Sequence, residues 1–447
     1  MQRAAALVLF AIVVVGGATP VASAQQPNIT QEHWYHSYLT LTNDVQAWAA
    51  DYPEIVVLTT AGTTVLGRQQ WVVQISDWTS DTKADGTAKE KVYIDGGHHG
   101  NEHLGTELAF LTAEFYIEGW ADGDSEVIEV LQNTELHIMI LLNADGNDAD
   151  TRWNMNQVDL NRNYDHHWTE DETASGDGPF SEPETSNNAD YMEAFVPEAD
   201  LYVTMHTGTW ILAYPWGFTP SMPSDWELFE FIRDDIHEKI DADLPIRNAN
   251  AGIYPTHGTS RDYGYGVMGF PCFTFETDDE QFLLGSIQSI SDRLALELEV
   301  MRYLISNVWY WRARLSVDSL VVEDGYVDLS VTNLGRASTA NATVHFVNEA
   351  GEVLWHSDNF SVNASNHTDA RLDASDLVMT TGGSFELHYQ KRVIDAALWV
   401  NEPVNESVMT IAEDSDGRLP APSLALSLLC ILFAATRVRK SGSAEIH

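Results

Sequence analysis

Basic residues are scarce in this sequence. Its 447 residues include 23 Lys and Arg against 67 Asp and Glu, which gives a formal net charge of -44 at pH 7. A general nucleic-acid-binding role is excluded, because a phosphate backbone requires a basic surface. The acidic excess predicts a solvated surface whose self-repulsion keeps the protein in solution. The charge balance alone identifies no partner.

Cysteine is scarcer still, with only Cys272 and Cys430 in the chain. Cys430 lies in an apolar segment near the C-terminus, so the remainder of the chain has one thiol and no internal disulfide. Stability must therefore come from a packed core, and an apolar content of 44% is sufficient for one. Cys272 follows Pro271 and precedes Phe273, which predicts a small buried hydrophobe rather than a nucleophile.

Two apolar runs stand at the ends of the chain. Residues 4–15 follow Arg3 and precede the small residues 22–24, which predicts a secretory signal peptide over residues 1–24. The second run precedes Arg437, Arg439 and Lys440. This layout predicts a linker over residues 412–422 and a transmembrane anchor with a basic cytoplasmic tail over residues 423–447. A cleaved surface-sorting signal has a similar layout, so both alternatives stay open. Either way, we expect an exported protein at the cell surface.

The segment between these ends contains two regions with different sequence patterns. Residues 25–312 alternate helical and strand patterns, which predicts a three-layer α/β/α domain on a mixed, largely parallel sheet. Residues 313–411 contain short β-type runs separated by Asn, Gly and Ser, the pattern of a small antiparallel β-sandwich. In the first domain we expect strands at residues 70–75, 91–95, 135–142, 201–206 and 272–276, and helices around residues 45–50, 102–117 and 283–309.

One motif in the first domain has the residue types of a metal site. Residues 95–103 read Asp-Gly-Gly-His-His-Gly-Asn-Glu-His, where a strand ends, glycines form a turn and a helix begins. His99 and Glu102 are three residues apart, so on a helical turn they share a face and could bind one cation together. A rival interpretation is the inverted zincin pattern, in which His99 and His103 bind zinc and Glu102 is the base. That alternative predicts an endopeptidase of different architecture.

Further motifs follow in a fixed order downstream. They are residues 143–146 (Asn-Ala-Asp-Gly), 152–154 (Arg-Trp-Asn), 158–163 (Val-Asp-Leu-Asn-Arg-Asn), 201–208 (Leu-Tyr-Val-Thr-Met-His-Thr-Gly), 214–217 (Tyr-Pro-Trp-Gly), 258–262 (Gly-Thr-Ser-Arg-Asp) and 273–276 (Phe-Thr-Phe-Glu). This series resembles the M14 family of zinc carboxypeptidases over roughly residues 33–310. A single motif of this kind would be weak, whereas the ordered series is specific.

The resemblance implies one Zn²⁺ per chain and the catalytic groups around it. His99, Glu102 and His206 correspond to the three zinc ligands, with a fourth position left for water, as a catalytic zinc site requires. Asp159 corresponds to the carboxylate that orients His99. Glu276 corresponds to the general base that takes a proton from the attacking water. Those residues are joined by Arg152, which corresponds to the arginine that stabilises the oxyanion.

The resemblance also assigns the residues that hold the substrate. Asn161 and Arg162 correspond to the pair that binds the free C-terminal carboxylate, and arginine suits this role because its planar fork bonds a carboxylate bidentately. Tyr254 corresponds to the mobile tyrosine that closes over the bound residue. Arg261 occupies the position facing the departing side chain, and its charge favours a C-terminal Glu or Asp. The alternative is that Arg261 simply pairs with Asp262.

We therefore expect a metallocarboxypeptidase whose partners are peptides or proteins with a free C-terminus, and the membrane through the C-terminal segment. Two alternatives remain open. One is a zinc amidohydrolase that acts on cell-wall peptides or acylated amino acids, and the other is a catalytically silent surface-binding protein with the sandwich, which resembles immunoglobulin-like accessory domains, as its adhesive part.

Overall fold

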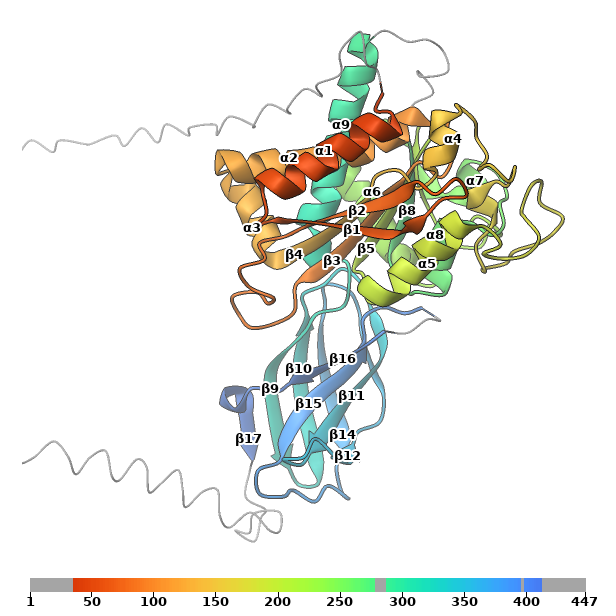
Figure 1. Ribbon diagram of the computed structural model, residues 1–447. Coiled ribbons are helices and arrows are strands. Elements are labelled where there is room, and N and C mark those ends of the chain that lie inside the picture. The colour runs from red at the N-terminus through yellow and green to blue at the C-terminus, as the bar shows by residue number, and fades with distance from the viewer. Residues whose placement is uncertain (1–34, 278–286, 395–397, 412–447) are drawn as a thin grey trace, which may run out of the picture.

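A computed structural model describes residues 35–277, 287–394 and 398–411 of the chain. These residues form an α/β domain and a β-sandwich that lies below it in Figure 1. The signal peptide predicted at residues 1–24 and the anchor predicted at residues 423–447 lie outside the described residues. Within the described ranges, no helix combines the length and apolarity that crossing a membrane requires.

The α/β domain is organised on one eight-stranded sheet. Its strand order is β1-β2-β4-β3-β5-β8-β6-β7. The four central strands β4, β3, β5 and β8 run parallel, whereas the β1–β2, β2–β4 and β8–β6 pairs are antiparallel. The predicted mixed, largely parallel sheet is confirmed. The strands are β1 (Val56–Thr63), β2 (Gln69–Ile75), β3 (Glu90–Gly96), β4 (Thr134–Met139), β5 (Leu201–Thr207), β6 (Ile211–Tyr214), β7 (Ile246–Asn248) and β8 (Cys272–Thr277).

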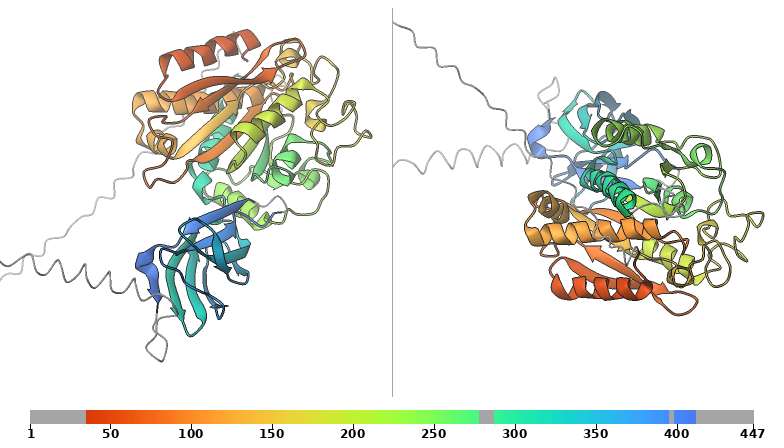
Figure 2. Two further views of the ribbon diagram at one scale, coloured as in Figure 1. Left: turned by 60° about the horizontal axis from the view of Figure 1, so that its bottom comes forward. Right: turned by 90° about the horizontal axis from the view of Figure 1, so that it is seen from above.

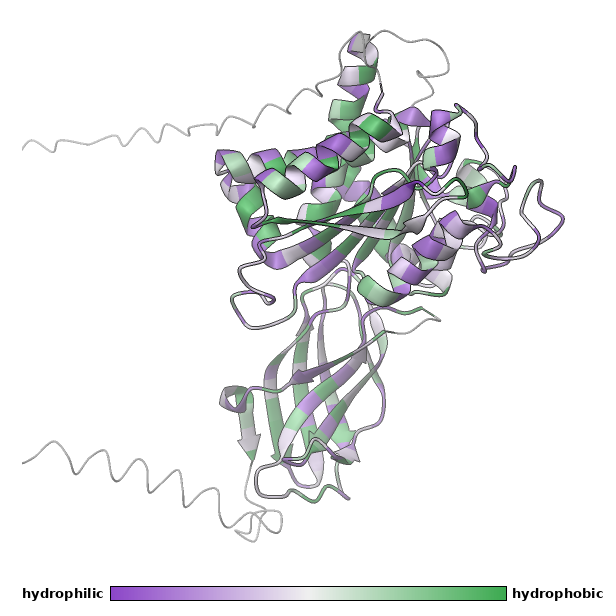
Figure 3. Ribbon diagram, in the orientation of Figure 1, coloured by the Kyte–Doolittle hydropathy of each residue, from purple (hydrophilic) through white to green (hydrophobic). Residues whose placement is uncertain are grey.

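Helices cover both faces of this sheet (Figures 1 and 2). The helix α2 packs on β3, β5 and β8 and contacts α9, while α8 packs on β5 and β8 and α5 packs on β1. Figure 3 shows the apolar colour concentrated on the strands, between helices whose surfaces carry more polar residues. The helices are α1 (Tyr38–Asp51), α2 (His103–Asp122), α3 (Ser125–Asn133), α4 (Ala144–Asp148), α5 (Pro183–Phe195), α6 (Trp226–Lys239), α7 (Ala249–Gly252), α8 (Ser260–Gly266) and α9 (Ile287–Ser306), with the short 3₁₀ turns η1 (Leu160–Arg162) and η3 (Val308–Tyr310).

The central strands are apolar because both of their faces are covered. Every residue of β5 is buried, and so is all of β3 except Lys91. Strands of this kind read as continuous hydrophobic runs, which made them visible in the sequence. Cys272, at the start of β8, is a buried free thiol, as predicted. Parallel strands also bring their carboxyl ends to one edge of the sheet, where ligand sites of α/β domains lie.

Three predicted boundaries were wrong. The strand expected at residues 135–142 ends at Met139, although the buried apolar run continues through Ile140 to Leu142. The apolar run in the sequence indicates which residues are buried, and here residues 140–142 remain buried after the strand has ended. The helix expected at residues 102–117 continues to Asp122 and ends at Gly123, whose φ of 74° caps it in the left-handed region. In the described part of the predicted 283–309 helix, α9 ends at Ser306 and a 3₁₀ turn follows.

The second body is a two-sheet sandwich. One sheet has the order β14-β10-β9-β17 and the other β12-β11-β15-β16, with β13 paired to β11. All described pairings are antiparallel except β17–β9, so the predicted antiparallel sandwich is close to the observed one. The strands are β9 (Leu315–Glu323), β10 (Tyr326–Asn333), β11 (Thr339–Val347), β12 (Val353–His356), β13 (Phe360–Val362), β14 (His367–Asp373), β15 (Ser384–Gln390), β16 (Trp399–Pro403) and β17 (Met409–Ile411), with a 3₁₀ turn η4 (Glu406–Val408) before β17.

Candidate metal centre and active site

The first two candidate ligands lie where β3 passes into α2. Gly97 turns the chain with a φ of 69°, a conformation that glycine adopts without steric cost. Gly105, in the first turn of α2, lies so close to β5 that a Cβ there would stand 2.8 Å from the carbonyl oxygen of Met205. The small residue thus lets the start of α2, with Glu102 just before it, approach the strand that carries His206.

The third ligand and the candidate base come from neighbouring parallel strands. His206 is near the carboxyl end of β5 and is directly paired in register with Glu276 on β8. Residues paired in register point to the same face of a sheet, so the imidazole and the carboxylate face the same space. The loop around residues 99–102 meets them there. Residues that are far apart in the sequence therefore converge through strand order alone.

The three candidate ligands form one compact cluster. Glu102 bridges the two histidines, with Oε1 at 2.7 Å from Nδ1 of His99 and Oε2 at 3.0 Å from Nδ1 of His206. The two Nδ1 atoms are 3.2 Å apart. One ligand atom from each of these residues lies within 4.8 Å of the others, and all three residues are buried. The rival inverted zincin arrangement is not formed, because His103 bonds instead to Asp150 and Asn147.

Two charged residues hold this cluster from behind. Asp159 accepts from Nε2 of His99 at 2.9 Å, which leaves the Nδ1 atom to face the cluster. Arg152 donates to Asp159 through Nε and Nη2 at 3.0 and 2.9 Å, and to Oε1 of Glu102 through Nη1 at 3.0 Å. A histidine whose second nitrogen is bonded to a carboxylate has a fixed tautomer and ring orientation, as metal ligands require.

The charges in this cluster shift one another's pKa values. Burial alone would lower the pKa of His99, but the Glu102 and Asp159 carboxylates outweigh it and raise the pKa to about 9. Burial likewise works against ionised Glu102, yet the two histidines hold its pKa well below the ordinary value. Burial and then repulsion by Glu102 raise the pKa of Glu276. A carboxyl with a raised pKa next to a cation site is suited to receive and return protons.

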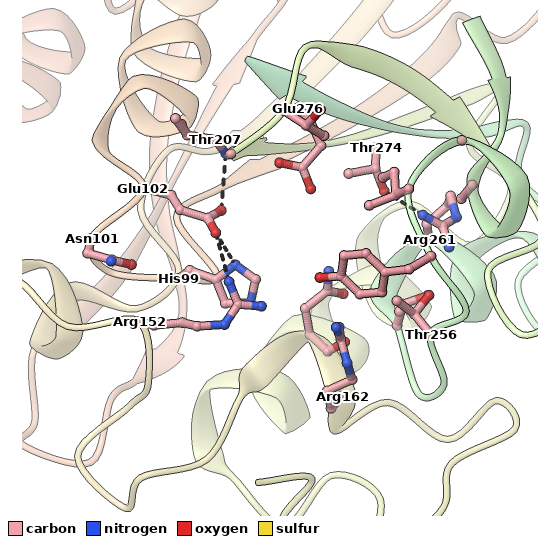
Figure 4. A pocket seen from close by; sticks show the side chains of 18 residues that line it. His99, Asn101, Glu102, Arg152, Arg162, Thr207, Thr256, Arg261, Thr274 and Glu276 are labelled. Carbon is pink, nitrogen blue, oxygen red and sulfur yellow. Dashed lines mark hydrogen bonds and ion pairs between the residues drawn. The ribbon is translucent and has the colours of Figure 1, made fainter. Parts of the chain in front are cut away.

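This donor set fits zinc. Two imidazole nitrogens and one carboxylate are a common ligand set of catalytic Zn²⁺, which needs a fourth, open position. The cluster opens onto a cavity of about 490 Å³ lined by His99, Glu102 and Glu276 among others (Figure 4). Zinc bound at such a site supplies Lewis-acid chemistry and lowers the pKa of water. Glu276, which points into the open space in Figure 4, is placed to take the proton.

The predicted carboxylate-binding pair lies in the same cavity. Both Asn161 and Arg162 line it, on the 3₁₀ turn η1. Oδ1 of Asn161 accepts from the backbone N–H of Ser260 at 3.0 Å, so its Nδ2 is the group available as a donor. Arg162 donates to the carbonyl of Asn161 at 2.8 Å, and its Nε lies 3.7 Å from Glu172. Glu172 in turn contacts His257 at 2.9 Å.

Two further predicted residues complete the wall. Tyr254 lines the cavity with 51% of its surface exposed, as expected for a side chain that is free to close. Arg261 is buried, donates from Nε to Asp262 at 3.0 Å and from Nη1 to Thr274 at 3.0 Å. Its pairing with Asp262, the alternative left open above, is therefore present. The structure brings all ten predicted site residues to one region.

Three residues of this region escaped sequence reasoning. Thr256, Thr274 and Glu172 contact the cavity wall or the residues that form it, yet each is an ordinary residue in a loop or strand. Thr274 stands two residues before Glu276 on β8, so the period-two spacing of a strand could have found it. Thr256 and Glu172 lie outside helices and strands and gave no such signal.

The fold and the cluster define a metallohydrolase built on a mixed α/β sheet. Residues 41–292 match the family model of peptidase M14, described as zinc carboxypeptidase, which spans more than half of the chain. The chain belongs to this family, and its enzymatic class is that of the metallocarboxypeptidases.

Relatives and solved structures agree with this placement. Carboxypeptidase B of Astacus astacus is 25% identical over 291 residues, which cover 57% of this chain and 91% of that protein. Zinc carboxypeptidase A 1 of Drosophila melanogaster is 26% identical over 276 residues, 54% of this chain and 63% of that protein. Bovine thrombin-activatable fibrinolysis inhibitor, solved in complex with tick carboxypeptidase inhibitor, matches with a TM-score of 0.52 and 22% identity, over 62% of this chain and 97% of that one. At this identity the structural match shows the fold alone.

Proposed function

We propose that this protein is a zinc-dependent carboxypeptidase that hydrolyses the C-terminal peptide bond of peptides or proteins outside the cell. It binds one Zn²⁺ through His99, Glu102 and His206. The observation that carries the proposal is the shared cavity, which is lined by His99 and Glu102 of the ligand cluster, by Glu276 and by the pair Asn161 and Arg162. The guanidinium of Arg162 would bind the C-terminal carboxylate of a substrate. This selects the ends of chains, because an internal peptide bond offers no carboxylate.

The roles of the catalytic residues follow from their contacts. Glu276 takes the proton of the attacking water and returns it to the leaving amine. Arg152 already donates to Glu102 at the edge of the cluster, and its guanidinium supports the negative charge that develops on the carbonyl oxygen. Tyr254 closes over the bound C-terminal residue and excludes water.

A preference for C-terminal Glu or Asp is part of this proposal. Nη2 of Arg261 and Oγ1 of Thr256 are buried and have no hydrogen-bond partner among the described residues. Thr256 Oγ1 and Arg261 Nη2 lie 2.2 and 2.3 Å from the position that a Cβ on Gly217 would occupy, and Oδ2 of Asp262 lies 3.2 Å from it, so the missing side chain of this glycine lets the two donors come together beside Asp262. Asp262 holds Arg261 by Nε and does not occupy Nη2. An acidic side chain of the substrate would satisfy both donors at once.

Location is proposed from the sequence. The signal-like residues 1–24 favour export, and the apolar segment in residues 423–447 favours retention at the cell surface, with residues 25–312 as the catalytic domain and 313–411 as the accessory sandwich. Fractionation of cells that express the full chain, compared with a chain truncated after residue 411, tests this. Release of the truncated form only is the expected result, and equal release of both would refute retention.

The activity is tested with blocked dipeptides that end in Glu, Lys, Phe or Ala, with and without a chelator. We expect Glu to be released fastest and all release to be lost with chelator.

The Arg261→Met variant tests the acidic preference. It should lower the Glu-to-Phe ratio of kcat/KM by roughly 10- to 100-fold, which corresponds to a charge-assisted hydrogen bond of ~1.5–3 kcal/mol. The matched control is Arg247→Met, which removes an exposed arginine from β7. Faster release of Phe than Glu by the parent would refute the acidic preference, and equal cleavage of amidated substrates would refute the exopeptidase role.

A further inference from the structure

A fully buried polar network lies beneath the metal cluster and is not used by the mechanism above. Its centre is Asp95, near the end of β3, with an exposed fraction of 0%. Oδ2 of Asp95 accepts from the Tyr202 hydroxyl at 2.7 Å and from Nδ2 of Asn188 at 2.9 Å. Burial raises the pKa of this carboxyl to about 6. Buried polar groups are costly unless they are satisfied, so this network in the middle of the sheet requires an explanation.

Strand register connects Asp95 to the metal ligand His206. Asp95 on β3 is the direct partner of Thr204 on β5. Thr204 precedes His206 by two residues, so both point to the same face of β5. Oγ1 of Thr204 lies 3.3 Å from Nε2 of His206. The hydroxyl therefore stands between the buried carboxylate and the imidazole.

A metal bound at Nδ1 of His206 would set the hydrogen-bond directions along this path. Nδ1 of His206 faces Glu102 and His99, so a metal held there leaves the ring proton on Nε2. Nε2 has two polar neighbours, the Thr204 hydroxyl at 3.3 Å and Nδ2 of Asn161 at 3.4 Å. The amide nitrogen is a donor, and only the hydroxyl can accept. The Nε2–H of His206 therefore donates to Thr204.

The remaining contacts direct the hydroxyl proton of Thr204 toward Asp95. The Tyr164 hydroxyl accepts from Asn188 at 2.7 Å and lies 2.8 Å from Nε2 of His98, to which it can donate. The His98 ring proton is then on Nδ1, which lies 3.3 Å from Oγ1 of Thr204 and 3.4 Å from Oδ1 of Asp95. Oδ1 of Asp95 is buried and has no hydrogen bond of normal geometry among the described residues. Since Nδ1 is a donor, Oδ1 is the acceptor left for the hydroxyl of Thr204, and an interaction with Thr204 opposes the rise that burial causes in the pKa of Asp95.

We propose that Thr204 and Asp95 are positioning residues that fix the ring orientation and tautomer of His206, as Asp159 does for His99. The proposal rests on the zinc-binding role of His206 given above. One carboxylate thus supports each histidine ligand, directly for His99 and through a hydroxyl for His206. Groups that orient a metal ligand in this way change metal affinity about 10- to 100-fold when they are removed.

The test measures zinc affinity rather than turnover. Thr204→Val removes the hydroxyl at nearly constant volume, and Thr204→Ser restores it. The matched control is Thr112→Val, which removes an equally buried hydroxyl on α2 that donates to Leu108 at 2.7 Å. For each metal-stripped variant, competition with a chromogenic chelator gives the Kd for Zn²⁺, and thermal unfolding gives Tm.

We expect the Kd for Zn²⁺ to rise about 10- to 100-fold in Thr204→Val and to stay within about twofold of the parent in Thr204→Ser and Thr112→Val. A parental Kd in Thr204→Val, or the same rise in both valine variants, would overturn the proposal. Asp95→Asn keeps the shape of the side chain and is measured in the same way, so a parental Kd there also overturns it. If the parent itself binds no zinc, the proposed function fails instead.

Discussion

The α/β domain buries carboxylates in its interior, whereas the described part of the β-sandwich keeps its own at the surface. Asp95, Glu102, Asp159 and Glu184 are among the buried acids of the first domain. The buried charged residues of the described sandwich are Arg314, Lys391 and Arg392. Each of these pairs with an acid of the α/β domain, Glu90, Glu198 and Asp225 respectively.

The buried acids of the α/β domain include those of the metal cluster, whereas the buried cations of the sandwich contact the α/β domain. Buried charge persists only where partners compensate for it. The metal cluster and the contact between the domains are two of the places where it occurs. The sandwich has histidines too, and His345 stacks on His388 with ring centres 4.9 Å apart. In residues 35–277, 287–394 and 398–411, however, the side chains close enough to share one ion are those of His99, Glu102 and His206.

Removing the base should have the largest effect. Glu276→Gln is expected to lower kcat about 10²- to 10⁴-fold, the usual contribution of a general base, because the amide cannot take a proton. Zinc content should not change, since Glu276 is outside the ligand cluster. The comparison variant is Glu386→Gln on β15 of the sandwich, which should leave both quantities unchanged. Full activity in Glu276→Gln would contradict the assignment.

Breaking the contact between the domains should cost stability and leave catalysis intact. Arg314→Ala removes the partner that lies 2.7 Å from Glu90. The free energy of unfolding should fall by about 3 kcal/mol, the low end for a broken buried pair, because Lys83 still pairs with Glu90 at 2.8 Å. Denaturant titration measures this change. Arg371→Ala, which removes an exposed pair within the sandwich, should cost less than ~1 kcal/mol. Equal costs would show that Arg314 is not a buried contact.

The smallest expected effect depends on pH. Burial and then repulsion by Glu118 raise the pKa of Glu114 on α2 from 4.5 to about 7. The folded state therefore favours the protonated form, and this contribution to stability is lost as pH rises through 7. Glu114→Gln should melt at the same temperature as the parent at pH 4 and higher at pH 8. Calorimetric scans at both pH values check this, and a lower Tm at pH 8 would contradict it.

The ligand set could be predicted from the sequence because its parts stand at strand ends. His99 follows β3, while His206 and Glu276 are the penultimate residues of β5 and β8, and each strand is a conspicuous apolar run. The family resemblance assigned a role to each residue, and parallel strand order explains why they meet. In contrast, the edge strands β1 and β7 and the strand β6 beside β7 are short or half-exposed and gave no strong pattern.

The network around Asp95 could not be predicted for a different reason. Its links depend on which residue of β3 pairs with which residue of β5, and the sequence pattern does not specify register between two fully buried strands. The same limit applies to Thr256, whose role depends on the close approach of Gly217 from another loop. Contacts set by register and loop packing require coordinates.

The zinc assignment is tested most directly by X-ray anomalous scattering, recorded on both sides of the zinc absorption edge from crystals of protein purified with zinc. The account predicts one anomalous peak per chain, about 2.0–2.2 Å from Nδ1 of His99, Nδ1 of His206 and the carboxylate of Glu102. A map with no peak at that position, or with its peak at His345 and His388 on the sandwich, would contradict it.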